Sequence, residues 1–594
     1  MSIWVDAICI NQEDLAEREQ QIPQMRQIYS CAYQVVIWLC PSLKSTISAY
    51  TALLWLAREV QTTGELQEVV QRYKSWSSTL SPFQISSTAR FPWRLEVFLA
   101  LRIFLALEYW HRLWILQEFA LAKADAPILW GSHCLSIHGL WTAVKLIESQ
   151  EVAIGQHIST SSAVTTKPDL TKDRRLEDRS GCPARQWKHI QRIMRVRNRT
   201  WVVDAQQSRE VVTATFDLAR NAGVSDQRDK IYGILGTPAI AHLQATRLTT
   251  NYQLNLKQVF VSFTRELVCG NDLNAMRHLY APAGGLRLQW RVLRTSSERN
   301  WGVRIPFPSI TKEIAEVGPP CPRQLPSWVV CWTCQTVPVM RLPDIYRADH
   351  GLGSQSVTFH GQDLSVLRCR AVVVDSIATL SSLNSSEADT LYPHKCAKAL
   401  SLPNLYGDIE ALREAVCRTV IADSSEGGVR SLPSVWKELL QPLVWDPRGY
   451  WQPRSPGLEF SLGAFMGRNK TLVLGGHRVW HLTGRRKVQS RRLIRVERGD
   501  RHENVRKAIS WASNVLAWKR LIGTHQGRVG LCVAAAREGD SIAIFSGCGT
   551  PMVLRKDGVI WRIIGECYLH EVMDGEVAES VRNENAKVEE IDIH

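Results

Sequence analysis

The sequence predicts an α/β protein with a parallel sheet in its first part, a helical middle and a strand-rich last third. Two apolar runs, at 2–9 and 35–39, flank a segment with helical spacing. Helical patterns continue through 186–280, and apolar and polar residues alternate between glycines in the last third. Because single hydrophobic cores stop growing near ~250–300 residues, a chain of 594 residues should form more than one domain.

The opening forty residues predict a β-α-β unit. Residues 2–9 are rich in strand formers, and Asn11 could cap a helix that follows. Pro23 should end that helix or open a second one, in which apolar residues of 25–32 recur at helical spacing. The continuous apolar run 35–39 predicts a second strand, parallel to the first.

The remaining chain divides by composition. Residues 46–60 and 95–124 have helical patterns, and 128–145 predict a short strand followed by a helix. Low apolar content predicts a polar linker at 151–185, and abundant Gly, Pro, Arg and Ser predict a connecting segment at 281–326. Between them lies the helical region 186–280. Residues 327–594 predict a mixed α/β region that ends in antiparallel strands, at 541–545, 552–555 and 559–564.

Composition and cysteine usage point to a soluble protein of the cytoplasm. The longest apolar candidate, Val97–Leu107, contains Arg102 and is too short to span a bilayer, so we expect no membrane span. The 15 cysteines are an odd number, and Cys9, Cys31, Cys40 and Cys269 have apolar neighbours. Such cysteines are typical of buried thiols in a reducing compartment.

A cysteine pair and a basic run give weak indications of a metal site and of nucleic-acid binding. Cys331 and Cys334, with Cys321 upstream, have the spacing of half a zinc site, but no second half follows, which favours two buried cysteines and no metal. The run 485–507 holds ten Lys or Arg against three acids and could bind nucleic acid. It lacks interleaved aromatic residues, which favours a solvated surface insertion.

Glu118 is the candidate catalytic residue. It follows Trp114 by four positions, so the two side chains should share one helix face. An apolar wall beside a carboxyl raises its pKa through desolvation. The alternative is that Glu118 pairs with a nearby Arg on a solvent-facing helix.

Two blocks of residues together resemble the fungal heterokaryon incompatibility (HET) domain. The first block contains Trp4, Asp6, Cys9, Asn11 and Gln12, and the second contains Arg112, Trp114, Gln117 and Glu118. Segments at 226–235, 325–328 and 565–576 resemble pieces found downstream in full-length HET proteins. HET domains ordinarily open with a strand and a Ser-Tyr-x-Trp-Gly-like motif, so we expect 1–150 to be a HET domain lacking its first strand.

The resemblance implies an effector of fungal nonself recognition that promotes programmed cell death through protein association. Its partners would be other incompatibility proteins or further copies of itself. HET domains are also similar to TIR domains, some of which cleave NAD, so the alternative is a TIR-like NAD glycohydrolase. In that case NAD would be the substrate rather than a bound cofactor, Glu118 would be catalytic, and Asp6 would lie at a ligand-binding strand end. The expected fold is then a partial TIR-like parallel sheet.

Overall fold

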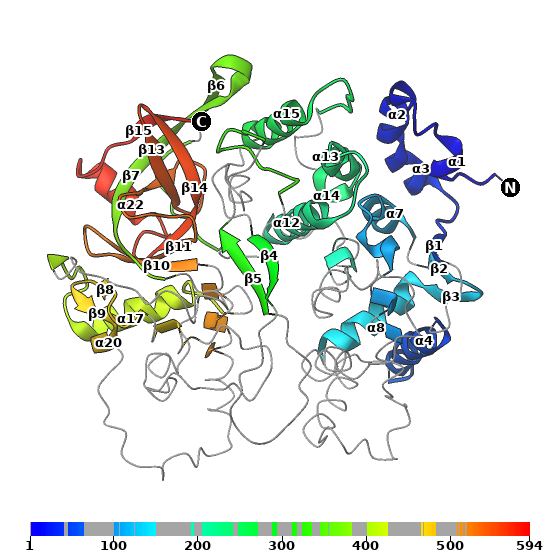
Figure 1. Cartoon of the computed structure of the whole chain (residues 1–594), viewed down its shortest axis with the longest axis horizontal. Coiled ribbons are helices and arrows are strands. Elements are labelled where there is room, and N and C mark those ends of the chain that lie inside the picture. Colours follow the sequence, from blue (N-terminus) through cyan, green and yellow to red (C-terminus); the bar gives the residue numbers. More distant parts are fainter. Residues whose placement is uncertain are drawn as a thin grey trace, which may run out of the picture. The chain divides into compact units, whose positions relative to one another are not determined.

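The computed structural model divides into two compact units, Met1–Val259 and Phe260–His594 (Figure 1). It contains helices and a strand-rich C-terminal sheet, as the predicted mixed α/β class requires. With single-residue and short gaps, the structure describes residues 2–40, 46–63, 100–149, 190–196, 205–241, 248–270, 288–293, 312–317, 323–334, 345–382, 401–425, 430, 462–482 and 508–594.

The predicted strand at 2–9 is wrong. Asp6–Cys9 instead form a single helical turn, α1, in which the N–H groups of Ile8 and Cys9 donate to the carbonyl of Val5. Asp6 favours this conformation, because an acidic side chain in a first turn interacts well with the positive end of a helix. Strand propensity alone did not decide the structure, since no strand pairs with this segment among the described residues. The expected β-α-β unit within the first forty residues is therefore also wrong.

Three short helices follow, α2 (Leu15–Gln21), the 3-10 helix η1 (Ile22–Gln24) and α3 (Met25–Cys31). The cap of α2 is Asp14 rather than Asn11: Asp14 Oδ1 accepts hydrogen bonds from the N–H groups of Ala16 and Glu17. Pro23 occupies the first turn of η1, as expected for a residue that lacks a backbone N–H.

A three-stranded sheet carries the predicted apolar strand. β1 (Ile37–Cys40) pairs in parallel with β2 (Pro127–Trp130), and β2 pairs in antiparallel fashion with β3 (His133–Ser136). The helices α4 (Thr46–Thr63) and α8 (Ile137–Ser149) confirm the helical patterns that begin at residue 46 and within 128–145. Among the described strands β1 pairs only with β2, so it forms an edge of this sheet (Figure 1).

The predicted helix at 95–124 is broken. The 3-10 helix η2 (Glu108–His111) and the helix α7 (Ile115–Leu121) are separated at Arg112–Trp114. The break coincides with a backbone bridge, in which the N–H of Gly223 donates to His111 and the N–H of Leu113 donates to Gly223. Pairing with a distant segment thus replaces two hydrogen bonds that a continuous helix would make.

The predicted helical region contains four described helices. These are α12 (Ala205–Asn221), α13 (Asp229–Leu235), α14 (Pro238–Ala241) and α15 (Leu256–Cys269). The boundary between the two compact units falls within α15. The first unit therefore contains the HET-like segments together with α12–α14.

A closed ring of six strands dominates the second unit. Its order is β10 (Lys519–Thr524), β11 (Val529–Val533), β14 (Ile560–Leu569), β13 (Met552–Asp557), β12 (Ser541–Phe545) and β7 (Val366–Leu380), which pairs back to β10. These pairings are antiparallel, which confirms the predicted C-terminal strands. β7 closes the ring because its last residues contact β10 while its middle contacts β12.

Short elements surround the ring. β6 (Val357–His360) and β15 (Glu589–Ile593) pair with the first half of β7, and the 3-10 helix η6 (Gln362–Leu364) lies between β6 and β7. Two short pairs, β4 (Leu288–Leu293) with β5 (Lys312–Val317) and β8 (Val473–Leu474) with β9 (His477–Arg478), lie apart from it in the strand order; the first falls in the predicted connecting segment. The helices are α17 (Ile409–Val420), α20 (Val479–Leu482) and α22 (Glu576–Arg582).

Alternation along the ring strands builds two buried clusters. Leu521, Leu531 and Tyr568 pack on one face with residues of α17, whereas Ile522 and Cys532 point to the opposite face. Successive side chains of a strand point to opposite faces, so neighbouring residues necessarily enter different clusters. Strands β10, β11 and β14 consequently contribute to both clusters, whereas β7, β12 and β13 contribute to the second one.

Several sequence expectations concern exposure or lie outside the described residues. Cys9, Cys31 and Cys269 are exposed and Cys40 is half-buried, so their expected burial is wrong. Each of the four is the last residue of its helix or strand, where apolar neighbours in sequence do not ensure burial. The linker 151–185 and the basic run 485–507 lie outside the described residues. No described helix has the length and apolar character that a membrane crossing requires.

Candidate functional site

Five side chains from four elements of the first unit form a charged and aromatic group, called here the acid–tyrosine cluster. They are Asp6 of α1, Tyr29 of α3, Tyr109 of η2 and Glu118 of α7, together with Arg112, which lies between η2 and α7. Each of the two HET-like blocks supplies members, and α3 packs against α7. Residues separated by more than a hundred positions thus act on one another electrostatically.

Glu118 lies at the inner side of the cluster and is partly buried. Its Oε2 accepts a hydrogen bond of 3.0 Å from the buried hydroxyl of Tyr109. Burial raises the pKa of Glu118, while the Tyr109 hydroxyl and the Arg112 charge act in the opposite direction and Asp6 adds to the increase. The net shift of this pKa is upward, and Tyr109 is the hydrogen-bond donor to the carboxyl group.

Asp6 and Arg112 form the more exposed side of the cluster. Asp6 Oδ2 lies 4.0 Å from Arg112 Nη2, the outer limit of an ion pair, and its side chain is 29% exposed. Asp6 Oδ1 also accepts a hydrogen bond from the N–H of Ala7. Such a loose, half-solvated pair contributes little to stability and leaves both groups able to contact a ligand.

Tyr29 joins the two sides. Its ring meets that of Trp4 edge to face, with centroids 5.8 Å apart. Burial raises the pKa of Tyr29, and the charges of Glu118 and then Asp6 raise it further. Tyr109 responds in the same way, because burial and Glu118 raise its pKa. Both hydroxyls therefore stay protonated at neutral pH, and that of Tyr109 donates to Glu118.

The other predicted residues have different positions. Gln117 points away from the cluster: its buried Nε2 donates to the carbonyl of Gly233 on α13 at 2.9 Å. Trp114 is partly buried at the N-cap of α7. Cys9, Asn11 and Gln12 are exposed, and Gln12 Nε2 donates to the Asp6 carbonyl at 3.1 Å. The structure thus brings together Asp6, Arg112 and Glu118, with Trp4 beside them. Gln117 instead connects α7 to α13.

A second group of side chains holds α2 against α13. Arg18 Nη2 lies 3.3 Å from Asp229 Oδ2 and 3.1 Å from the Tyr252 hydroxyl, which itself donates to Asp229 Oδ1. The Arg18 guanidinium also stacks over the Tyr252 ring, 4.3 Å from its centroid. Burial raises the pKa of Asp229 to about 6, despite the lowering effect of Tyr252 and Arg18. We call Arg18, Asp229 and Tyr252 the clamp.

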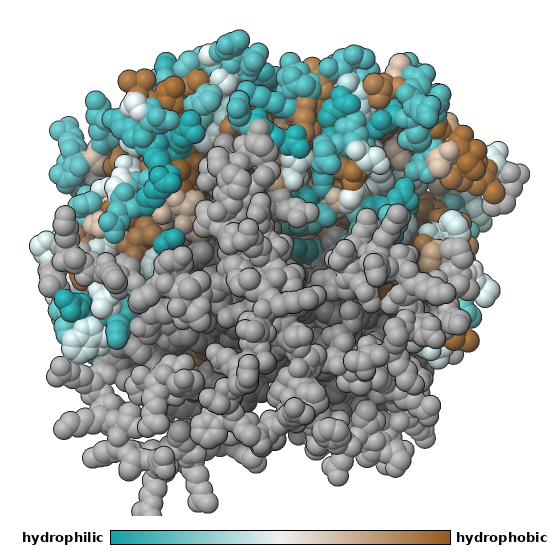
Figure 2. All heavy atoms as spheres, in the orientation of Figure 1, coloured by the Kyte–Doolittle hydropathy of each residue, from teal (hydrophilic) through white to brown (hydrophobic). Residues whose placement is uncertain are grey.

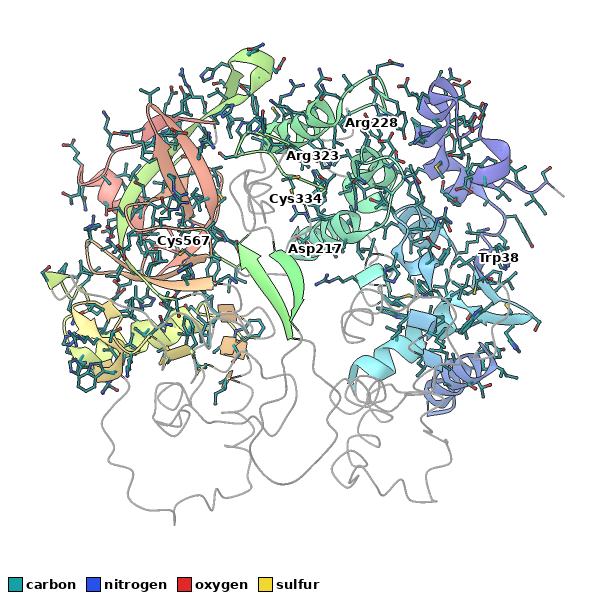
Figure 3. All side chains as sticks on the ribbon, viewed as in Figure 1. Trp38, Asp217, Arg228, Arg323, Cys334 and Cys567 are labelled. Atoms are coloured by element: carbon teal, nitrogen blue, oxygen red, sulfur yellow. The ribbon has the colours of Figure 1, made fainter. Side chains whose placement is uncertain are left out.

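Arg228 links the start of α13 to the segment that contains Tyr252 of the clamp. Its guanidinium pairs with Asp226 at 2.7 Å and donates to the carbonyls of Tyr252 and Leu254. Burial alone would raise the pKa of Asp226, but the hydrogen bonds and charge of Arg228 outweigh it and lower the pKa. Figure 3 labels Arg228 at this position.

Lys230 and Gly233 complete the support of α7. The buried ammonium of Lys230 donates to the carbonyls of Ala219, Arg220 and Ala222 at the end of α12. Gly233 lets Leu113 approach closely, since a Cβ there would lie 2.6 Å from Leu113 Cδ2. Residues 219–235 therefore determine where α7, and with it Glu118, is held.

Sequence reasoning missed Tyr109 and the clamp. Tyr109 lies nine positions before Glu118, on a different helix, so helical spacing could not associate them. Asp229 lies within the HET-like segment 226–235, but its contact with Arg18 joins positions 211 apart. The signal that could have suggested it is the charge density of 226–230, where four of five residues are charged.

The chemistry available in the cluster is acid–base and hydrogen-bonding chemistry. It offers one carboxyl of raised pKa, one exposed carboxylate, one guanidinium and two protonated tyrosines. No group of three described His, Cys, Asp or Glu side chains is arranged to hold a metal ion. The half zinc site at Cys331 and Cys334 accordingly has no completed form in the described part of the chain.

Comparison with known proteins identifies the class. Residues 1–118 match the family model of the heterokaryon incompatibility protein (HET), and residues 502–587 match that of the Het-6 beta-barrel domain. The first match contains the acid–tyrosine cluster, and the second contains five strands of the ring but not β7. The chain therefore contains one segment that matches the HET family and one that matches the Het-6 beta-barrel domain, and in both it is similar to fungal heterokaryon incompatibility proteins.

A curated relative agrees with this assignment. The chain is similar to heterokaryon incompatibility protein 6, OR allele, of Neurospora crassa, with 42% identity over 59 residues. The matched segment covers 10% of this chain and 9% of that protein. No solved structure matches the chain.

Proposed function

We propose that this protein is a cytoplasmic effector of fungal nonself recognition, which promotes cell death by associating with a second copy of itself through its N-terminal segment. The observation that supports this proposal is the exposure of large apolar side chains within residues 2–40. Ile3, Ile8, Tyr33 and Trp38 are 78%, 81%, 89% and 62% exposed. In Figure 2 hydrophobic atoms gather on the surface where the N-terminal elements of Figure 1 lie.

The edge strand β1 adds a second means of association. Val36 and Trp38 are exposed, whereas the alternating residues Val35, Ile37 and Leu39 are buried (Figure 3 labels Trp38). An edge strand with exposed apolar residues is a template for pairing with another chain, unless charges or a covering segment block it. A large aromatic side chain such as Trp38 would anchor such an interface.

The test compares Trp38→Ser with Val559→Ser, which removes an even more exposed apolar side chain (89% exposed) at the turn between β13 and β14. We expect the wild type and the Val559 variant to associate in light scattering of the purified protein and to kill fungal cells on expression. Trp38→Ser should remain monomeric and lose killing. Killing by a monomeric Trp38→Ser variant, or association unchanged by it, would contradict the proposal. Association only after addition of fungal extract would indicate another incompatibility protein as the partner.

A second candidate is a TIR-like NAD glycohydrolase, which the grouping of Asp6, Arg112 and Glu118 favours. Breaking the nicotinamide–ribose bond develops positive charge on the ribose, which a fixed carboxylate such as Glu118 stabilises. The exposed Arg112 could contact a phosphate of the substrate. The parallel pairing of β1 with β2 is compatible with a TIR-like sheet.

Nicotinamide release from NAD by the purified protein tests this candidate. Glu118→Gln should reduce the rate by about 10²–10³-fold, whereas Glu13→Gln, an exposed carboxylate at the start of the chain, should not change it. Because burial raises the pKa of Glu118, the charged form and the rate should both increase with pH. Equal release by wild type and Glu118→Gln would exclude this role for Glu118.

A further inference from the structure

Residues 325–334 form a buried segment in the second unit, called here the tryptophan strap. Trp328 and Trp332 are fully buried. Trp328 Nε1 donates to the carbonyl of Ser365 at 2.9 Å, and the Trp332 ring packs against Phe263 of α15 with centroids 5.6 Å apart. The Ser327 hydroxyl accepts a hydrogen bond from the N–H of Ile563 and donates to the carbonyl of His594. The strap therefore connects α15 with the ring.

Two cysteines face each other at the end of the strap. The sulfurs of Cys331 and Cys334 are 3.3 Å apart, and the Cys331 sulfur lies 3.5 Å from the Thr333 hydroxyl. A disulfide bond is about 2.05 Å long, so the sulfurs need to approach by only about 1 Å. Cys331 and Cys334 are 3% and 6% exposed, and Thr333 between them is partly exposed. The pair thus lies just beneath the surface (Figure 3 labels Cys334).

We propose that Cys331 and Cys334 are a redox-active dithiol that a peroxide converts into an intramolecular disulfide. The thiolate of Cys334, the more exposed of the two, attacks a peroxide oxygen and becomes a sulfenic acid, and with hydrogen peroxide the leaving hydroxide takes up a proton to form water. The Cys331 sulfur then attacks the Cys334 sulfur and forms the S–S bond, and the sulfenic oxygen leaves as a second water. Two thiols lose two electrons and two protons, and one hydrogen peroxide is reduced to two waters.

The geometry favours this chemistry over the alternatives for the same residues. A zinc site needs further ligands, and the described residues offer no group of three. A pair with only a structural role would resemble Cys532 and Cys567, which stand opposite each other on β11 and β14 and are fully buried. The Cys331–Cys334 pair differs because it lies on an irregular, bent segment rather than within a ladder, so its sulfurs can approach without disturbing strand pairing.

Peptide mass measurement provides the test, because trypsin releases both cysteines in one peptide, 324–341, which contains no other cysteine. The full-length protein is treated with hydrogen peroxide, alkylated and digested. We expect this peptide to lose two hydrogen atoms and to resist alkylation, and dithiothreitol should reverse both changes. Because Trp332 lies between the two cysteines, its fluorescence should decrease on oxidation and recover on reduction.

Single variants separate the proposed dithiol from general thiol oxidation. Cys331→Ser and Cys334→Ser should each abolish the reversible disulfide, whereas Cys134→Ser, which removes an exposed cysteine of β3, should leave it unchanged. The proposal is overturned if the 324–341 peptide stays fully alkylated after Cys134 has reacted, or if it gains only oxygen atoms. It is equally overturned if zinc alone blocks alkylation and peroxide forms no disulfide.

Discussion

We expect the stability of the contact between α2 and α13 to depend on pH because of Asp229. Its carboxyl is 3% exposed, and burial raises its pKa from 3.8 to about 6. The folded chain therefore binds a proton at Asp229 more tightly than the unfolded chain does. The resulting stabilisation is complete below about pH 4 and is lost as the pH rises through about 6. A difference of about two pKa units corresponds to about 3 kcal/mol, or up to about 100-fold in a local opening equilibrium.

Asp229→Asn removes this titration and retains an oxygen that accepts the Tyr252 hydroxyl. Hydrogen exchange of the amides of α2 and α13, compared between wild type and variant at each pH, reports the opening and cancels the intrinsic pH dependence of exchange. We expect the protection of the wild type relative to the variant to decrease by up to about 100-fold between pH 4 and pH 7.

Asp226→Asn is the matched control, because the pKa of Asp226 is shifted in the opposite direction. Arg228 outweighs burial and lowers that pKa, so ionised Asp226 stabilises the fold above its unfolded pKa and the stabilisation is lost as the pH falls. Relative to Asp226→Asn, the wild type should therefore gain protection as the pH rises. Parallel pH profiles for the wild type and both variants would refute the reasoning for Asp229.

Three further substitutions have definite expected outcomes. Tyr109→Phe removes the hydroxyl that lowers the pKa of Glu118, so this pKa should increase, as the carboxyl infrared band would report. Lys230→Met leaves three carbonyls of α12 without their donor and should destabilise the first unit by about 2–4 kcal/mol in denaturant unfolding. Gly530→Ala would place a Cβ 2.6 Å from the Tyr568 carbonyl oxygen, and should lower the stability of the ring by about 1–3 kcal/mol in thermal unfolding. An unchanged band, or stability equal to that of the wild type, would contradict the respective expectation.

The elements that the sequence predicted correctly are those whose structure is determined by the pattern of their own side chains. The helix that starts at residue 46 and the strands β12–β14 have clear apolar periodicity, and the structure contains them. The strand expected at 2–9 failed because a strand requires a neighbour, and the composition of a segment does not show whether a neighbour exists. The same limit applies to β7, whose role in closing the ring depends on strands more than 130 positions away.

The candidate site was predictable to the extent that its residues belong to recognisable blocks. Asp6, Arg112 and Glu118 were singled out, and they act on one another in the structure. Tyr109 was not predicted as a site residue, because a hydroxyl that donates to a carboxylate has no sequence signature when donor and acceptor lie on different helices. The clamp was also missed, since Arg18 and Asp229 meet only through the packing of α2 against distant residues.

The two HET-like blocks therefore contain residues of two kinds, with separable consequences. Asp6, Arg112 and Glu118 face the acid–tyrosine cluster, whereas Gln117 faces α13 and fixes the rotation of α7. Because Gln117 and Glu118 are adjacent on one helix, any shift of α13 changes the position of Glu118 relative to Tyr109. Residues 219–235 lie outside the matched segment 1–118, but their contacts determine the geometry within it. A fragment ending at residue 118 would leave Gln117 without Gly233 and Leu113 without Gly223. The structural unit that carries the acid–tyrosine cluster must therefore extend through α13.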